Sequence, residues 1–84
     1  ATWQVRCQAA KGLSLFGSAD SVPRLRKALR DRHWWVRLYA ATALAELGPA
    51  GEEALSAALQ DEDAAVREMA RYLLERGEMV PALP

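Results

Sequence analysis

The chain has few of the residue types from which catalytic and metal centres are built. Its 84 residues include one cysteine, Cys7, and one histidine, His33. A single cysteine excludes an internal disulfide and favours a reducing compartment. A metal site needs several converging His, Cys or carboxylate ligands, and covalent catalysis needs a nucleophile beside a base. No spacing in this sequence favours either, so we expect no enzyme activity, no catalytic residues, no metal site and no cofactor.

Long apolar runs and alternating apolar patterns are also missing. No stretch is long and apolar enough to span a bilayer, and the pattern of these residues leads us to expect no signal peptide. Nothing alternates with a period of two residues, which makes β-strands unlikely by pattern. We therefore expect an all-α protein in the cytoplasm, or the cytoplasmic part of a larger protein that is anchored elsewhere.

The net charge is zero, but the charges are divided unequally along the chain. Residues 1–42 carry eight Lys or Arg and two Asp, a net charge of +6. Residues 43–84 carry three Arg and nine Asp or Glu, a net charge of −6. An elongated molecule would keep this division as a basic end and an acidic end. Head-to-tail or segment-swapped self-association is therefore one hypothesis for this chain.

An internal repeat is the strongest feature that the sequence does contain. The dipeptide Val-Arg occurs three times, at spacings of 31 and then 30 residues, and an Asp closes each of the first two units. The repeat positions are Val5, Arg6, Asp31, Val36, Arg37, Asp61, Val66 and Arg67. A fixed period in this range indicates a repeat array. The units cover approximately residues 2–31, 32–61 and 62–84, and the chain begins almost inside the first of them, so we expect a piece of a longer protein.

Each unit has the apolar spacing of an α-helix. Val36 is followed by Ala40, Leu44 and Leu47, in steps of 4, 4 and 3 residues that lie on one helical face. The same steps lead from Val5 to Phe16 in the first unit. The expected helices cover residues 3–16, 19–30, 34–47, 52–60 and 64–76, and residues 78–84 would form a truncated or frayed second helix of the third unit.

Helix ends are marked by residues suited to capping. A candidate N-cap precedes each repeated Val by three residues, and these are Thr2, His33 and Asp63. Gly17 and Gly48 occur where a left-handed C-terminal cap is expected, and Gly77 is a third candidate.

These residues resemble the short HEAT-like repeats first associated with phycobilisome lyases. The matching residues are Asp31…Trp35-Val36-Arg37…Ala40-Ala41…Leu44…Leu47-Gly48 and Asp61-Glu62-Asp63…Val66-Arg67…Ala70…Leu74. The match covers essentially the whole chain as one domain, residues 1–84. It implies a short right-handed α-solenoid, an α-α superhelix of about two and a half helix pairs. Such repeats are used mostly as scaffolding, with the second helix of each pair lining a concave surface.

Two groups of residues are candidates for binding a partner. A basic run lies on and just after the second helix, and it consists of Arg24, Arg26, Lys27, Arg30 and Arg32. It is either a solvated helix face or a surface for an acidic partner. Trp34 and Trp35 are adjacent, so on a helix they point about 100° apart and one of them can stay exposed. The repeated arginines, beside Asp31 and Asp61, predict an Arg–Asp ladder across the unit junctions.

The function that we predict from these features is a non-catalytic protein–protein interaction or scaffold module. It would bind a protein partner, for example an acidic one, on the concave face through Arg24, Lys27 and Arg30, with Trp34 as an aromatic anchor at the rim. Weak binding of the nucleic-acid backbone through the basic half is an alternative, although Glu52 and Glu53 in the next unit make it unlikely. A structural spacer or self-association module is the remaining alternative.

Overall fold

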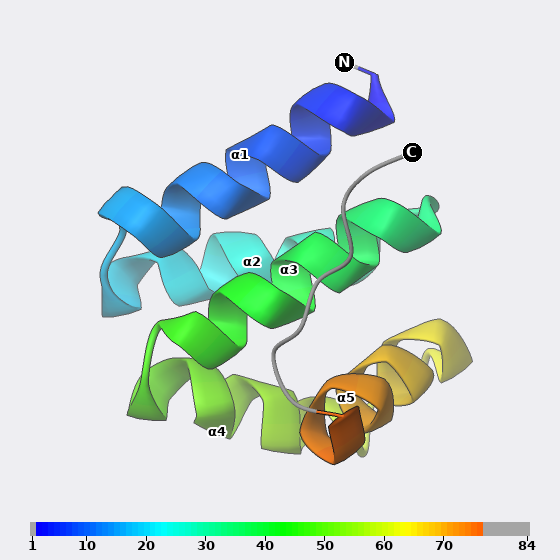
Figure 1. Cartoon of the computed structure of the whole chain (residues 1–84). Helices are drawn as coiled ribbons and strands as arrows, with labels where there is room; N and C mark the ends of the chain where they lie inside the picture. Colours follow the sequence, from blue (N-terminus) through cyan, green and yellow to red (C-terminus); the bar gives the residue numbers. More distant parts are fainter. Residues whose placement is uncertain (1, 77–84) are drawn as a thin grey trace.

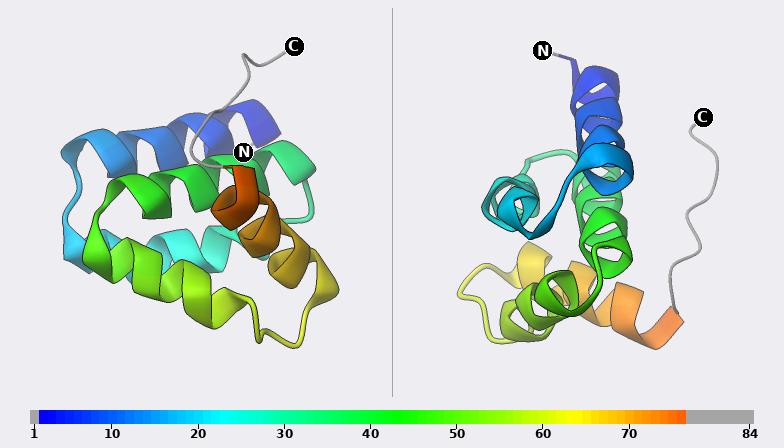
Figure 2. Two further views of the ribbon diagram at one scale, coloured as in Figure 1. Left: turned by 60° about the horizontal axis from the view of Figure 1, so that its bottom comes forward. Right: turned by 90° about the vertical axis from the view of Figure 1, so that its left-hand side faces the viewer.

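The chain folds into two layers of helices. A computed structural model describes residues 2–76, and nothing below refers to the structure of the others. The elements are α1 (Trp3–Phe16), a short 3₁₀ turn (Ala19–Ser21), α2 (Val22–Ala28), α3 (Trp34–Glu46), α4 (Pro49–Ala58) and α5 (Ala64–Arg76). Helices α1, α3 and α5, the first helices of the three units, follow one another in one layer (Figure 1). Helices α2 and α4 lie on one side of that layer (Figure 2).

This arrangement confirms the predicted fold class, a short all-α solenoid. Each second helix packs against the first helix of its own unit and against that of the next unit. The order of stacking along the molecule therefore follows the order of units in the sequence. The expected second helix of the third unit, residues 78–84, lies outside the described residues.

Helix α3 is the centre of the core. It packs against each of the other four helices, and its side chains are accordingly buried on most sides. Val36, Leu38 and Leu44 are at most 1% exposed. A helix that is apolar on every side is stable only where neighbours surround it, and α3 has neighbours on all sides.

The predicted apolar stripe of the first helix is largely exposed, with only Leu13 packed partly against the core, which corrects the sequence-based expectation. Val36 and Val66 are 1% and 2% exposed, but Val5 is 57% exposed and Phe16 is 90% exposed. The reason is the neighbour that each residue meets. Val36 lies against α2 and Val66 against α4, the second helix of the preceding unit in each case. No described helix has that position relative to α1.

Two details of the helix ends differ from the predictions. Gly48 has a left-handed backbone with φ 81°, as expected, but Gly17 is extended with φ −90°. A Cβ on Gly17 would overlap the Leu13 carbonyl oxygen and the Ser21 hydroxyl, so close approach explains this glycine. Helix α4 begins at Pro49 and not at the predicted residue 52. Proline is tolerated there because the N–H groups of the first helical turn have no partner within the helix, so the N–H that proline lacks is not missed.

The cysteine is part of the interior, which leads to a test of its reactivity. Cys7 belongs to the buried face of α1 and is fully buried. Burial raises the pKa of its thiol, the charge of Asp31 raises it further, and Arg6 opposes the change. Because the thiolate is the reactive form, we expect Cys7 to react with a disulfide reagent far more slowly in the native protein than in concentrated guanidinium chloride. Equal rates, followed by thiol absorbance near neutral pH, would contradict this placement.

Candidate functional site

A groove runs between the two second-layer helices, and we call it the α2–α4 groove. Its volume is about 300 Å³. It is lined by Pro23, Arg26, Lys27, Leu29, Arg30, Ala54, Ala57, Ala58, Asp61 and Val66. Helix α2 supplies the cationic side chains, and α4 supplies small apolar ones. The groove thus has a basic wall beside an apolar floor.

The four residues predicted to bind a partner do not form one site. Lys27 and Arg30 line the α2–α4 groove, whereas Arg24 lines a separate groove between α1 and α2. Arg24 lies near the start of α2, whereas Arg30 lies in the turn after α2 ends at Ala28, so the two side chains meet different neighbours. Trp34 lies elsewhere, beside α5. The structure adds Arg26 to the groove instead, and its i,i+4 spacing to Arg30 was the signal for it in the sequence.

Arg30 is held by an ion pair. Its Nη2 lies 2.6 Å from Oδ2 of Asp61, in the loop between α4 and α5. The pair spans one end of the α2–α4 groove and joins the first unit to the second. Arg30 therefore has a role within the fold, and Arg26 and Lys27 remain as the groove cations that form no ion pair within residues 2–76.

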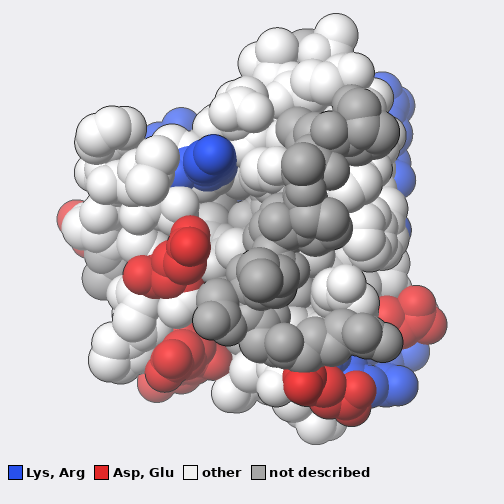
Figure 3. Space-filling view, in the orientation of Figure 1, with Lys and Arg blue, Asp and Glu red and all other residues white. Residues whose placement is uncertain are grey.

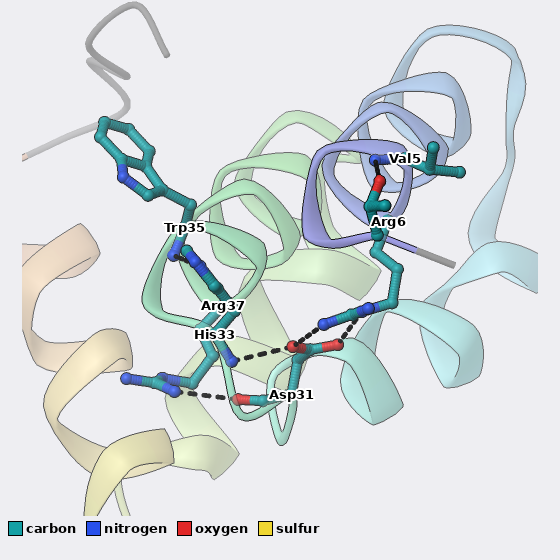
Figure 4. Close-up of polar contacts among 7 residues, drawn as sticks. Val5, Arg6, Asp31, His33, Trp35 and Arg37 are labelled. Carbon is teal, nitrogen blue, oxygen red and sulfur yellow. Dashed lines mark hydrogen bonds and ion pairs between the residues drawn. The ribbon is translucent and has the colours of Figure 1, made fainter. Parts of the chain in front are cut away.

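The loop between α2 and α3 is organised by Asp31, as Figure 4 shows. Arg6 donates from Nε to Oδ2 at 2.6 Å and from Nη2 to Oδ1 at 3.0 Å. The His33 backbone N–H donates to Oδ1 at 2.9 Å. The Arg6 hydrogen bond is the main cause that lowers the pKa of Asp31, with the His33 N–H and the charges of Arg6 and Arg32 acting in the same direction against partial burial.

The predicted Arg–Asp ladder forms at one rung only. Arg6 binds the Asp31 carboxylate, but Arg37 donates to the Asp31 backbone carbonyl oxygen at 2.9 Å. Arg67 repeats this contact, donating to the Asp61 carbonyl oxygen at 2.7 Å. Arg37 and Arg67 thus hold the backbone of the preceding loop, whereas Arg6 binds the side chain of the loop that follows it. These contacts with the loops explain why an arginine recurs at the same position of each repeat better than binding of a ligand does.

His33 is the N-cap of α3, as its position three residues before Val36 predicted. Its Nδ1 accepts the Trp35 backbone N–H at 3.2 Å, so Nδ1 carries no proton in this arrangement. The ring also stacks on Trp3, with centroids 4.3 Å apart and planes 12° apart. In the next unit Asp63 accepts the Ala65 N–H at 2.8 Å. The histidine cap thus differs from the aspartate cap in that its ring also stacks on a residue of α1. Residue spacing alone did not predict this stacking contact.

Trp34 lies in a cleft between α3 and α5. Its ring meets the rings of Trp35 and Tyr72 edge-on, with centroids 5.3 Å and 6.2 Å away. The side chain is 43% exposed, while Trp35 packs partly against the core. The cleft has a volume of about 230 Å³. Trp34 therefore marks a surface of the first layer and not the rim of the α2–α4 groove.

The comparison with known families identifies these stacked units. A family model of HEAT repeats matches residues 1–75. The chain belongs to the HEAT repeat family. No curated protein and no solved structure gave a match. HEAT repeats generally mediate protein–protein interaction as scaffolds and are generally non-catalytic.

Within residues 2–76, no three His, Cys, Asp or Glu side chains converge as a metal site would require. None of the described helices is long and apolar enough to cross a membrane.

Proposed function

We propose that this HEAT repeat protein is a non-catalytic interaction module that binds an acidic protein segment in the α2–α4 groove. The observation that carries the proposal is the pairing of a cationic wall with an apolar floor. Arg26 and Lys27 are exposed on α2, and Ala54 and Ala57 face them from α4. Small side chains allow a peptide backbone to approach closely, while the cations select negative charge.

The neighbouring charges favour a short acidic segment over a nucleic acid. A duplex backbone presents regularly spaced phosphates and requires a basic surface along its whole length. Helix α4 instead carries Glu52 and Glu53 in its first half, and Asp61 closes the end of the groove. Asp61 at the end of the groove, together with the negative charge that α4 carries, would repel phosphates that continued beyond the basic wall. A short acidic peptide of a few residues can be bound by the basic wall alone, because it does not extend to these carboxylates.

A charge-reversed variant and a matched control test this proposal. The Arg26→Glu/Lys27→Glu variant should bind a synthetic peptide of alternating Glu and Leu about tenfold more weakly than the native chain, because two favourable charge contacts become repulsive. Lys11→Glu/Arg71→Glu makes the same change in net charge on α1 and α5, away from the groove, and should bind like the native chain. Fluorescence anisotropy with a labelled peptide measures all three affinities.

Three results would overturn the proposal. One is an equal loss of affinity in both variants, which would assign binding to net charge alone. Another is no binding of the acidic peptide by the native chain. The third is tight binding of labelled duplex DNA with a steep decrease of affinity as salt rises, which would identify phosphates as the ligand.

A further inference from the structure

The open side of α1 carries most of the large apolar side chains that are exposed among the described residues. Three of the five large hydrophobic side chains with high exposure lie on α1, and they are Val5, Leu15 and Phe16. In α3 and α5 the residues equivalent to Val5 are covered by a neighbouring second helix. Nothing in residues 2–76 covers α1 in the same way. In Figure 3 the surface at the top, where α1 lies, carries few charged groups.

One line of α1 side chains lies on the open side of the helix, with Ala9 at the edge of the groove between α1 and α2. Val5, Ala9, Gly12 and Phe16 are separated by 4, 3 and 4 residues, which places them within about 60° of one another around the helix. We call this line the α1 stripe. It contains no charged residue. A Cβ built on Gly12 would meet nothing within 4 Å, so the space in front of the stripe is open.

The α1 stripe is complementary to itself. It has a large side chain at each end, Val5 and Phe16, and small residues, Ala9 and Gly12, between them. If two copies lie antiparallel, position 5 of one faces position 16 of the other, and position 9 faces position 12. The small residues then allow the two helix backbones to approach closely, and the large side chains pack at both ends of the contact, about 16 Å apart.

We propose that two copies of this chain pair through antiparallel contact of their α1 stripes, with Phe16 of each copy packed on Val5 of the other. The two stripes form an isologous interface, which closes after two copies. A second copy is the occupant because the order of large and small side chains in the stripe is the same in both directions, so an identical stripe that runs antiparallel matches it at all four positions. In the head-to-tail arrangement expected from the charge division, the uncharged α1 stripe of one copy would face α5 of the next. Helix α5 exposes Glu68, Arg71 and Glu75, so this arrangement has less support.

The salt dependence distinguishes the two kinds of association. Antiparallel pairing brings two basic halves of the chain together, so the net charges repel and added salt should strengthen the dimer. Head-to-tail pairing joins opposite charges, so added salt should weaken it. A dimer that weakens with salt, measured by sedimentation equilibrium of the full chain, would overturn the proposal.

Variants locate the interface without disturbing the core. Phe16→Glu should raise the dimer dissociation constant by more than about tenfold, because two phenyl groups lose their apolar cover and two charges take their place. Leu74→Glu introduces the same charge at an apolar residue on α5 that is 46% exposed, and it should leave the dissociation constant unchanged. A monomer at the highest soluble concentration, or equal effects of the two variants, would refute pairing through α1.

Cross-linking tests the direction of pairing. We expect a mixture of the Ala9→Cys and Gly12→Cys variants to form mixed disulfides under mild oxidation, since these positions face each other across the antiparallel contact. Each variant alone should cross-link poorly. Efficient disulfides between two copies of Ala9→Cys would indicate parallel helices and contradict the proposal. The buried Cys7 should not compete in this reaction.

Discussion

The Gly51→Ala variant should lose at least about 3 kcal/mol of folding free energy, although it adds one methyl group. Gly51 is buried in α4 where that helix crosses α3. A Cβ at this position would overlap the Leu44 carbonyl oxygen and would lie 2.7 Å from the carbonyl carbon. These are backbone atoms of the central helix, so no side chain can rotate away and the two helices must separate.

Gly12→Ala is the matched control for this prediction. Gly12 is also a helical glycine, but a Cβ there meets nothing within 4 Å. The substitution should stabilise α1 by up to about 1 kcal/mol, because alanine has the higher helix propensity. Because an 84-residue chain has a total stability of roughly 4–13 kcal/mol, thermal or urea unfolding of the dilute monomer resolves both changes. Equal effects would mean that α3 and α4 do not meet at Gly51.

The Asp31→Ala variant should be destabilised by about 2 kcal/mol near neutral pH, because it removes a carboxylate that accepts charge-assisted hydrogen bonds. The Asp31 side chain is 14% exposed and holds both Arg6 and the His33 N–H. Without the Asp31 carboxylate, the hydrogen bonds that link Arg6 of α1 to the loop before α3 are lost. Asp20→Ala removes an exposed carboxylate that forms no ion pair among the described residues, and it should have little effect.

The Asp31 prediction includes a pH dependence with a defined sign. The pKa of Asp31 is lowered in the folded state, chiefly by the Arg6 hydrogen bond. Its stabilisation is therefore complete above the unfolded pKa of about 4 and is lost as the pH falls through the lower, folded value. The stability difference between the native chain and Asp31→Ala should shrink on acidification to about pH 3 and below. A difference that stays constant in urea titrations over this range would contradict the assigned ion pair.

Much of the fold could be predicted from the sequence because its signals are local and repeated. The Val-Arg period identified the units, and steps of 3 and 4 residues identified the first helices, with α1 and α5 predicted to the residue. Thr2 and Asp63 were predicted as N-caps for the same reason, since a cap depends on the few residues next to it. The start of α4 was misplaced because Pro49 suits a turn and a first helical position equally.

The candidate site was harder to predict because it depends on which helix lies beside each residue. The basic run was visible in the sequence, but spacing along α2 did not show that Arg24 faces α1, or that Arg30 reaches Asp61 across a unit junction. Trp34 was assigned to the wrong surface because its neighbour, Tyr72, lies 38 residues away in the sequence.

The sequence by itself determined the repeat, the helical class and the division of charge, since each of these depends on residue order alone. Only the tertiary structure decided which of the equivalent residues are covered. Val5 and Val36 occupy the same repeat position, yet one is 57% exposed and the other 1%. Burial depends on the helix that packs against a residue, and a repeated sequence does not provide the same neighbour to every unit.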